Sequence, residues 1–338
     1  MKHYLLKLLL FFSPILLVVA IYVVLDPFMV VWHYDDYRVE DRAVFINRAY
    51  VSSRVFENQN DTCHYDSFIF GNSTSLNYYV ADWQRYIGTG THPFHFDAMN
   101  GSVEGIYLKV GFIDEHHAPI KNALVILDNK MLQKGDYRSH LFMQPATLTH
   151  NDNWVQFHST QFMTFLSPQF LRAYFDYLFT GKYKPYMKEV LQQPHRVSYD
   201  KPSNEIKETL AERLIDRGEY FTPERCEQFA GKQHPDSIDV PHIDAERRRM
   251  FGEIASVFKR HNTRVKVIVS PYYDRIRLNP SDLRFLQSTF GKQNVYDFSG
   301  PNKWNADYHN YYDTVHYRPH VARELLKIVY EESSVTTK

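Results

Sequence analysis

Residues 67–75 read Ser-Phe-Ile-Phe-Gly-Asn-Ser-Thr-Ser, and this stretch decides the fold. The apolar run that ends at Phe70 predicts a buried strand, and Gly71 predicts a sharp turn directly after it. A helical stretch is expected to follow from about 75 to 86. Ser73 therefore stands where a strand gives way to a helix. A serine in this place is either a helix N-cap or, if a base removes its proton, a nucleophile.

Strands and helices alternate on both sides of this stretch. The expected strands are short and apolar, and helical stretches lie between most of them. This alternation predicts parallel pairing through crossovers, hence an α/β fold with a doubly wound parallel sheet. The expected strands are 67–70, 93–99, 123–127, 264–270 and 294–298, and the expected helices are about 75–86, 103–115, 243–261, 281–290 and 319–332.

The alternation stops between about 130 and 240, where the chain is polar, aromatic and interrupted by prolines. We interpret this region as a largely helical insertion, with helices near 168–179 and 203–217. The insertion interrupts one α/β domain, and two further segments precede that domain. The chain thus divides into a transmembrane anchor, a lead-in segment, the α/β domain and a disordered tail, at 1–26, 27–64, 65–332 and 333–338.

The anchor is predicted from residues 8–25, a run of eighteen residues without a charge. With the apolar residues before it, this run reaches the roughly 20 residues that cross a bilayer. Lys2 and Lys7 precede or enter it and Asp26 follows it, which places the remainder of the chain on the periplasmic, extracytoplasmic side of the inner membrane. A cleaved signal peptide is the alternative, but no convincing cleavage site of small residues follows.

Composition argues against a nucleic-acid partner and leaves open whether the two cysteines form a disulfide. Lys plus Arg equals Asp plus Glu at 39 each, and a general nucleic-acid binder would need a basic surface. We therefore expect no nucleic-acid partner. Cys63 and Cys226 would be free to form a disulfide outside the cytoplasm, but the sequence alone does not decide whether they do.

A candidate base lies near the C-terminal end, in Asp313-Thr314-Val315-His316. A histidine can take the proton of a serine, and a carboxylate beside it fixes the tautomer and stabilises the imidazolium. A metal site built from this pair with His309 and His320 is the alternative. Pro319 interrupts the span between two of these histidines, so a shared ligand face is disfavoured and no metal is expected.

Polar or small residues follow several expected strands, and the carboxyl ends of parallel strands form the binding edge of such a sheet. The N–H groups of Ser73 and Gly101 and the side-chain amide of Asn129 are therefore candidates for an oxyanion hole. The alternative for Gly101 and Asn129 is ordinary turn chemistry.

These motifs together resemble the SGNH (GDSL-like) hydrolase superfamily, in particular its membrane-anchored, cell-surface acyltransferase-like branch. Residues 71–75 are similar to the Gly-Asp-Ser-x-Ser block, with Asn72 in place of the usual Asp. Residues 313–316 are similar to the Asp-x-x-His block, and Gly101 fits the glycine of the second block. The third block, usually Gly-x-Asn-Asp, is incomplete, because residues 127–129 read Leu-Asp-Asn without the glycine.

The resemblance implies a flavodoxin-like sheet and a triad of Ser73, His316 and Asp313. It implies that Ser73, Gly101 and Asn129 form the oxyanion hole. The expected function is acyl transfer or ester hydrolysis on a cell-envelope polysaccharide or glycan through an acyl-serine, with no cofactor. A membrane-bound exporter of the acyl donor is an expected partner. The alternative is a catalytically inactive glycan-binding or assembly protein of the same fold.

Overall fold

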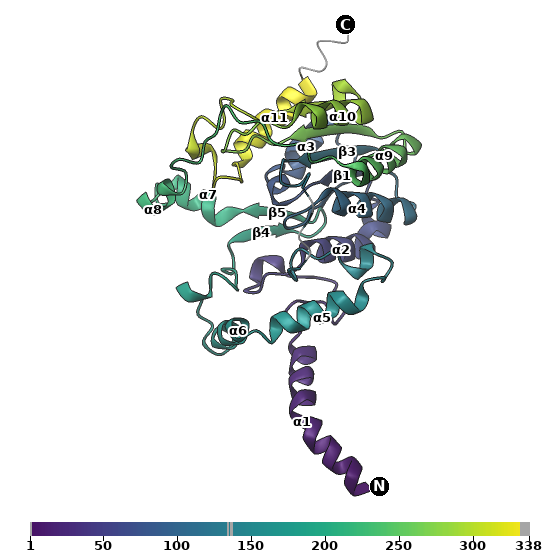
Figure 1. Ribbon diagram of the computed structural model, residues 1–338, viewed down its shortest axis with the longest axis vertical. Coiled ribbons are helices and arrows are strands. Elements are labelled where there is room, and N and C mark those ends of the chain that lie inside the picture. The colour runs from purple at the N-terminus through teal and green to yellow at the C-terminus, as the bar shows by residue number, and fades with distance from the viewer. Residues whose placement is uncertain (1, 134, 136–137, 332–338) are drawn as a thin grey trace.

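The computed structural model describes residues 2–133, 135 and 138–331, while the side chains of residues 2, 3, 5, 6 and 8–10 fall outside this description. The predicted disordered tail at 333–338 also lies outside the described residues. The described chain forms an α/β body from which the first helix, α1 (Lys2–Leu25), projects (Figure 1).

A five-stranded sheet with all neighbours parallel forms the centre of the body. Its strand order is β2-β1-β3-β6-β7. Phe70 at the end of β1 is in register with Phe96 of β2 and Val125 of β3, so these strands present their carboxyl ends at one edge. The predicted α/β class with a parallel sheet is confirmed. The strands are β1 (Ser67–Phe70), β2 (Pro93–Phe96), β3 (Asn122–Leu127), β6 (Arg264–Val269) and β7 (Val295–Asp297).

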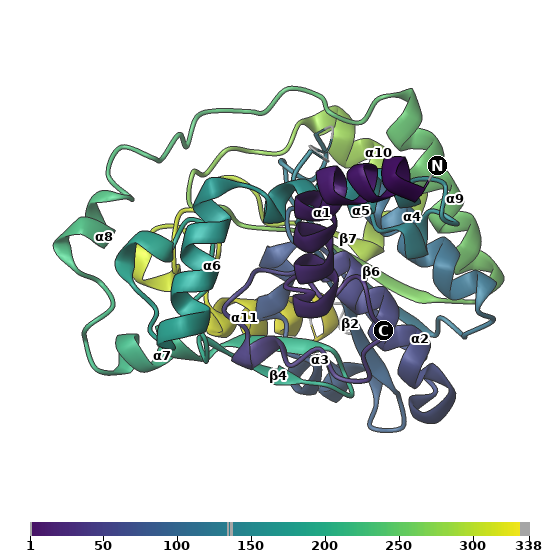
Figure 2. The same cartoon turned by 90° about the horizontal axis from the view of Figure 1, so that it is seen from below.

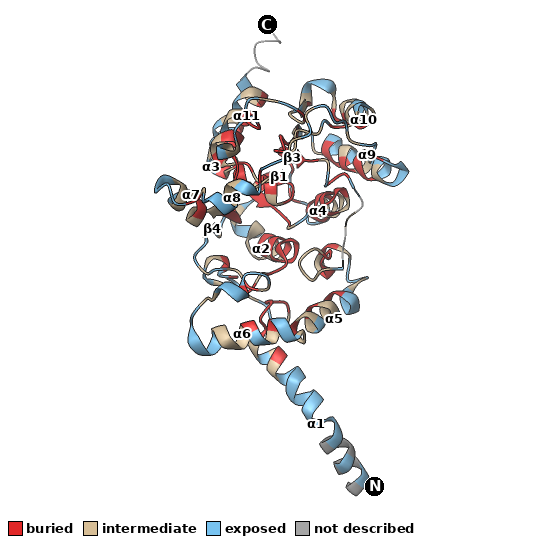
Figure 3. Cartoon of the chain, turned by 60° about the vertical axis from the view of Figure 1, so that its left-hand side comes forward, coloured by how far each residue is buried: buried red, intermediate tan, exposed pale blue. Residues whose placement is uncertain are grey.

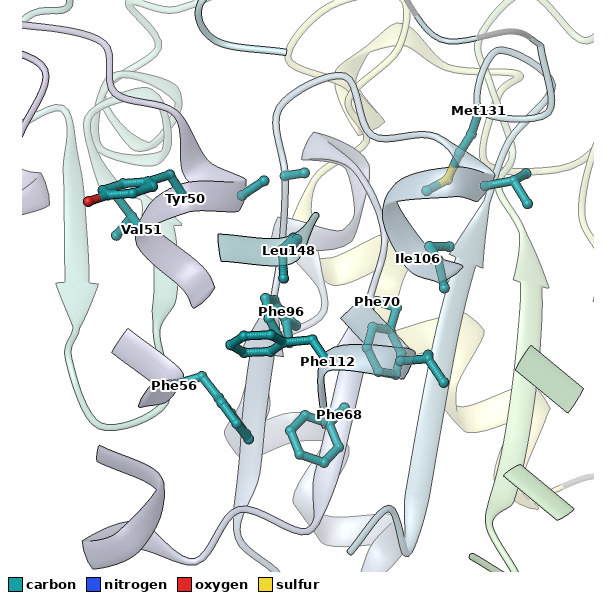
Figure 4. Packing of buried hydrophobic residues seen from close by; sticks show 14 of the residues in the cluster. Tyr50, Val51, Phe56, Phe68, Phe70, Phe96, Ile106, Phe112, Met131 and Leu148 are labelled. Carbon is teal, nitrogen blue, oxygen red and sulfur yellow. The ribbon is translucent and has the colours of Figure 1, made fainter. Parts of the chain in front are cut away.

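Helices cover both faces of this sheet. Phe68 and Phe70 belong to a core cluster with residues of several helices, while Ile69, which points the other way, belongs to a second cluster with residues of two other helices. Figure 4 shows the first cluster, in which Phe56 packs against Phe68 and Phe96. The first face carries α2 (Arg48–Cys63), α4 (Val103–Glu115), α9 (Ala245–Arg260) and α10 (Pro280–Phe290), and the second carries α3 (Val80–Ile87) and α11 (Pro319–Glu331).

The predicted helix at 75–86 is wrong in one respect, because the structure divides it. A 3-10 helix occupies Ser73–Asn77, and α3 begins only at Val80. The N–H of Val80 donates to the buried carboxylate of Glu205, which comes from the insertion. A side chain from far along the chain thus sets the start of α3.

The segment between β3 and α9 contains a hairpin as well as helices. The predicted helix at 203–217 is wrong in its first part, where β5 (Glu205–Glu208) pairs antiparallel with β4 (Val197–Asp200). Asn204 has a φ of 57°, which ends any helix, and its amide donates to the carbonyl of His95 at 2.7 Å. The helices of this segment are α5 (Trp154–Phe165), α6 (Pro168–Thr180), α7 (Thr209–Asp216) and α8 (Pro223–Glu227).

A buried ion pair ties α2 to the main sheet and to this insertion. Arg48 donates to both carboxylate oxygens of Asp97, just beyond β2, at 3.0 and 2.8 Å. Asn204 accepts from the same guanidinium at 3.0 Å. Breaking such a pair by removing one partner typically costs about 3–5 kcal/mol, because the other charge stays buried. The lead-in segment and the insertion are therefore both fixed to the carboxyl edge of β2.

No helix among the residues described in full is long and apolar enough to cross a membrane. The stretch predicted to be the anchor includes residues 5, 6 and 8–10, whose side chains lie outside the described residues. Where its side chains are described, α1 is exposed along most of its length (Figure 3).

Candidate active site

The turn after β1 requires glycine at position 71. A Cβ on Gly71 would lie 2.6 Å from the Cβ of Ser75 and 3.2 Å from the Cβ of Ile126. The first distance is far below van der Waals contact, and the second neighbour belongs to the buried strand β3. The chain can therefore turn from β1 into the 3-10 helix only without a side chain at this position.

Asn72, rather than Ser73, caps the 3-10 helix. Its Oδ1 accepts from the N–H of Thr74 at 2.9 Å, and its Nδ2 donates to Oδ2 of Asp128 at 2.6 Å. Asp128 in turn accepts from the N–H of Met131 at 2.8 Å. Because the cap is provided by the neighbouring residue, the hydroxyl of Ser73 is free for another partner.

Ser73, His316 and Asp313 form a continuous hydrogen-bonded chain. Oγ of Ser73 lies 2.7 Å from Nε2 of His316, and Nδ1 of His316 lies 2.8 Å from Oδ2 of Asp313. A proton on Nδ1 would be held by the carboxylate, which leaves Nε2 free to accept from the serine. The structure therefore brings together the three side chains predicted from opposite ends of the sequence.

Asp313 is held in its ionised form. Its burial opposes ionisation, but hydrogen bonds and charge from the His316 imidazole, together with backbone N–H donors, outweigh it and lower its pKa below the usual range. The backbone donors are Val315 and His316, whose N–H groups lie 2.8 and 2.9 Å from Oδ1. The backbone of its own loop thus fixes the position of the Asp313 carboxylate independently of the imidazole.

The loop that carries this pair is clamped from the insertion. Glu212 of α7 accepts from the hydroxyl of Tyr312, just before the loop, at 2.6 Å. It also accepts from Nε and Nη2 of Arg318, just after the loop, at 3.0 and 2.8 Å. Burial raises the pKa of Glu212, but the bonds from Arg318 and Tyr312 outweigh it, and the net pKa is lowered. One carboxylate therefore holds both ends of the segment that places the candidate base.

The three predicted oxyanion donors differ in how the structure places them around Ser73. As the first residue of the 3-10 helix, Ser73 has an N–H that no helical carbonyl accepts. A Cβ on Gly101 would lie 3.2 Å from the carbonyl oxygen of Gly71, so Gly101 packs against the residues preceding the serine. Asn129 follows β3 and is half-buried, and its Oδ1 has no partner among the described residues. The oxyanion roles of all three stay predictions.

A cavity of about 460 Å³ opens beside the triad, lined by Ser73, Asp313, His316 and residues of the insertion. This volume is in the range of small-molecule sites. One part of the lining is apolar and the other part is polar or charged. The apolar residues are Leu76, Val197, Ile206, Leu210, Ala211 and Leu214, and the polar or charged ones outside the triad include Gln193, Arg196, Glu208, Arg225 and Gln228.

The charged lining of the cavity is partly paired. Arg196 lies 3.1 Å from the carboxylate of Glu208, whose pKa is raised by burial against the opposing charge of Arg196. The guanidinium of Arg225 lies over the ring of Tyr220, 4.1 Å from its centroid. Tyr220 also donates its hydroxyl to the carbonyl of Tyr312 at 2.9 Å. The cavity wall and the histidine loop are therefore parts of one connected structure.

Sequence reasoning missed these contributions of the insertion. Asp128 also has a role that the sequence does not predict, because there it is only part of the incomplete third block, whereas in the structure it accepts from the amide of Asn72. Nothing in the sequence around Glu212 pairs it with Arg318, more than one hundred residues away. Long-range ion pairs of this kind leave no local pattern in a single sequence.

Of the four residues of the alternative metal cluster, Asp313 and His316 are bonded to each other, while His309 and His320 have other partners. His309 bonds through Nδ1 to Asp307 at 2.7 Å, and His320 through Nε2 to Asn310 at 2.8 Å. Over the described ranges, no group of three or more histidine, cysteine or acidic side chains is placed to hold a metal ion. Cys63 and Cys226 are both free.

Comparisons with known proteins give no family for this chain. No protein-family model matched the sequence, and no curated protein matched it either.

Proposed function

We propose that this chain is a membrane-anchored serine enzyme that transfers or hydrolyses acyl groups on a cell-envelope glycan. The observation that carries the proposal is the Ser73–His316–Asp313 chain, with bonds of 2.7 and 2.8 Å, in the lining of a cavity. A serine is a competent nucleophile only with a base in reach and a group that orients this base. All three parts are in place here.

In the proposed mechanism, Oγ of Ser73 attacks the acyl carbonyl while Nε2 of His316 takes its proton. The imidazolium is stabilised by Asp313 and then gives this proton to the leaving alcohol. The acyl-serine is next attacked by water or by an acceptor hydroxyl, with His316 again as base, and Ser73 is regenerated. The N–H groups of Ser73 and Gly101, with the amide of Asn129, are the proposed donors to the oxyanion.

The strand order supports the proposed likeness to SGNH hydrolases. Numbered along the main sheet alone, the order β2-β1-β3-β6-β7 reads 2-1-3-4-5, the order of flavodoxin-like sheets. Ser73 follows the first of these strands, and the Asp313–His316 segment precedes the last helix, as in the family blocks that the sequence resembles.

The cavity and the N-terminal helix support the proposed substrate and location. Amide and guanidinium groups of the lining offer partners for sugar hydroxyls, and the apolar part offers room for an acyl group. The exposed apolar side chains of α1 and the charges around it favour an anchor, with the body on the extracytoplasmic side. A donor exported through the membrane is the partner that acyl transfer there would need.

Labelling with a fluorophosphonate probe tests the proposal, because only an activated serine reacts. We expect the probe to increase the mass of the peptide that contains Ser73, and we expect no such increase in Ser73→Ala. Hydrolysis of an aryl acetate should be present in the variants that are labelled and absent from those that are not. A His316→Ala variant that folds normally but is not labelled would show that the base activates the serine. If the folded wild-type chain stays unlabelled, the alternative of an inactive glycan-binding or assembly protein is favoured.

A further inference from the structure

Large apolar side chains are exposed at the end of the folded body from which α1 projects. Most of them lie on α1, on the loop after it, or on α5 and α6. Figures 1 and 3 show α5 and α6 beside the point where α1 leaves the body, and Figure 2, the view from the side of α1, shows the same arrangement. Outside α1, this exposed set consists of Trp32, Trp154, Val155, Met163, Leu178 and Phe179.

The exposure of these side chains is large. Phe179 is 81% exposed, Val155 is 73% exposed and Met163 is 64% exposed. Phe175 stacks on Phe179 with ring centroids 6.0 Å apart, so the end of α6 presents an aromatic pair. Several strongly exposed apolar side chains on neighbouring elements favour an interaction site over an ordinary solvated face.

Packing and hydrogen bonds fix the end of α1 to the body. Tyr22 packs edge-on against Phe162 of α5, with ring centroids 5.1 Å apart. Asp26 is buried directly after α1, and its carboxylate accepts from the N–H groups of Val30 and Trp32 at 3.0 and 3.1 Å. The indole of Trp32 donates back to the carbonyl of Val23 at 2.7 Å. α1 and α5 are therefore held in one relative orientation.

We propose that the outer face of α5 and α6 rests on the surface of the phospholipid bilayer that α1 enters. This inference rests on the proposed anchor. Because the joint at Tyr22 and Asp26 is fixed, a bilayer around α1 would meet the elements that flank its end. Trp32, Trp154 and Phe179 would then lie at headgroup level, where aromatic rings are favoured.

The tryptophans of the chain are natural probes of this contact. The chain has four tryptophans, of which Trp32 and Trp154 are exposed, while Trp83 and Trp304 are buried in the body. The full chain is reconstituted into phosphatidylcholine vesicles, with or without bromine on the acyl chains near the headgroups. Bromine quenches tryptophan emission on contact. We expect Trp154→Phe to remove about half of the quenchable emission, and Trp32→Phe to remove the rest.

Each outcome of this experiment decides one part of the inference. If Trp32→Phe reduces quenching and Trp154→Phe does not, the anchor stands and the resting face is overturned. If neither variant changes the quenching, the anchor is overturned as well. Neither outcome bears on labelling of Ser73, so failure of the proposed chemistry is detected separately.

A charge placed on the face provides a second test with a matched control. Met163→Glu with Phe179→Glu is expected to lower the quenching of Trp154 at least about twofold, because carboxylates disfavour the interface. Val240→Glu, at a residue that is 63% exposed on the segment between α8 and α9, should change nothing. A second copy of the chain on this face would instead shield Trp154 from bromine and double the mass measured in detergent, which would overturn the proposal.

Discussion

The two sides of the candidate site are held in place by different means. Ser73 is positioned by the main sheet, through the tight turn at Gly71 and the buried bond between Asn72 and Asp128. His316 lies on a loop held by Glu212 from the insertion, through an ion pair and a hydroxyl bond that are partly exposed. The nucleophile thus belongs to the rigid core, whereas the position of the base depends on a peripheral helix.

This difference indicates where variation is tolerated. Changes on the serine side disturb the packing of a buried strand end, so they cost stability as well as activity. Changes on the histidine side disturb hydrogen bonds near solvent, which contribute less to the free energy of unfolding. Variants of the two sides should therefore separate stability from catalysis.

The largest effect on activity is expected from Asp313→Asn on the histidine side. The amide would hold the imidazole in the wrong tautomer, so Nε2 would carry a proton and could not accept from Ser73. In a triad of this type, kcat should fall by about 10³- to 10⁴-fold. Steady-state hydrolysis of an aryl acetate measures this, and a thermal unfolding midpoint close to that of the wild type serves as control. Retention of full activity would remove Asp313 from the mechanism.

On the serine side, Gly71→Ala is expected to cost about 3 kcal/mol of stability. The new Cβ would clash with Ser75 and with Ile126 of β3. Denaturant unfolding measures the loss. Gly252→Ala in α9 is the matched control, because a Cβ there meets nothing within 4 Å and alanine should stabilise the helix by about 0.5–1 kcal/mol. Equal effects of the two variants would contradict the tight turn.

Asn72→Asp tests the buried bond behind the serine and should cost about 2 kcal/mol at neutral pH. The new carboxylate would face Asp128, so one of the two would have its pKa raised. A raised pKa means that the deficit is absent below the ordinary aspartate range, grows as the pH rises toward the raised pKa, and levels off above it. The double variant Asn72→Asp with Asp128→Asn restores a donor–acceptor pair and should recover most of the loss. Chemical unfolding at pH 5 and pH 8 measures the stability of the wild type, the single variant and the double variant.

Glu212→Gln is expected to have the smallest effect, about 1 kcal/mol of stability and about a tenfold loss of kcat/KM. The pKa of Glu212 is lowered in the folded chain, so its contribution is present above the ordinary glutamate range. It is lost as the pH falls through the lowered pKa, and the stability deficit of the variant should shrink there. Glu253→Gln removes an exposed ion pair with Arg249 on α9 and should leave activity unchanged.

The main sheet could be predicted from the sequence because its signals are local. Phe68-Ile69-Phe70 is an apolar run of strand length, and Gly71 ends it in a way that needs no distant partner. The pairing of Ser73 with His316 was also predictable, because each lies in a segment that follows a strand, and the carboxyl ends of parallel strands meet at one edge of the sheet. The start of α3 could not be predicted from the sequence, since it depends on the carboxylate of Glu205.

The insertion could not be predicted in the same way. Its hairpin is tied to the main sheet by Asn204, whose side-chain amide donates to the carbonyl of His95, far away in the sequence. The clamp by Glu212 joins residues that are about one hundred positions apart. Tertiary contacts of this kind override local propensity, and a single sequence carries no pattern that reveals them.

The separation between Ser73 and His316, 243 positions along the chain, has a consequence for biosynthesis. A chain is made from its N-terminus, so the serine and its strand exist well before the loop that bears the base. During this interval the hydroxyl has no proton acceptor and stays unreactive toward esters. The proposed attack on an acyl group would therefore become possible only after the segment that carries His316 had been made and had folded onto the sheet.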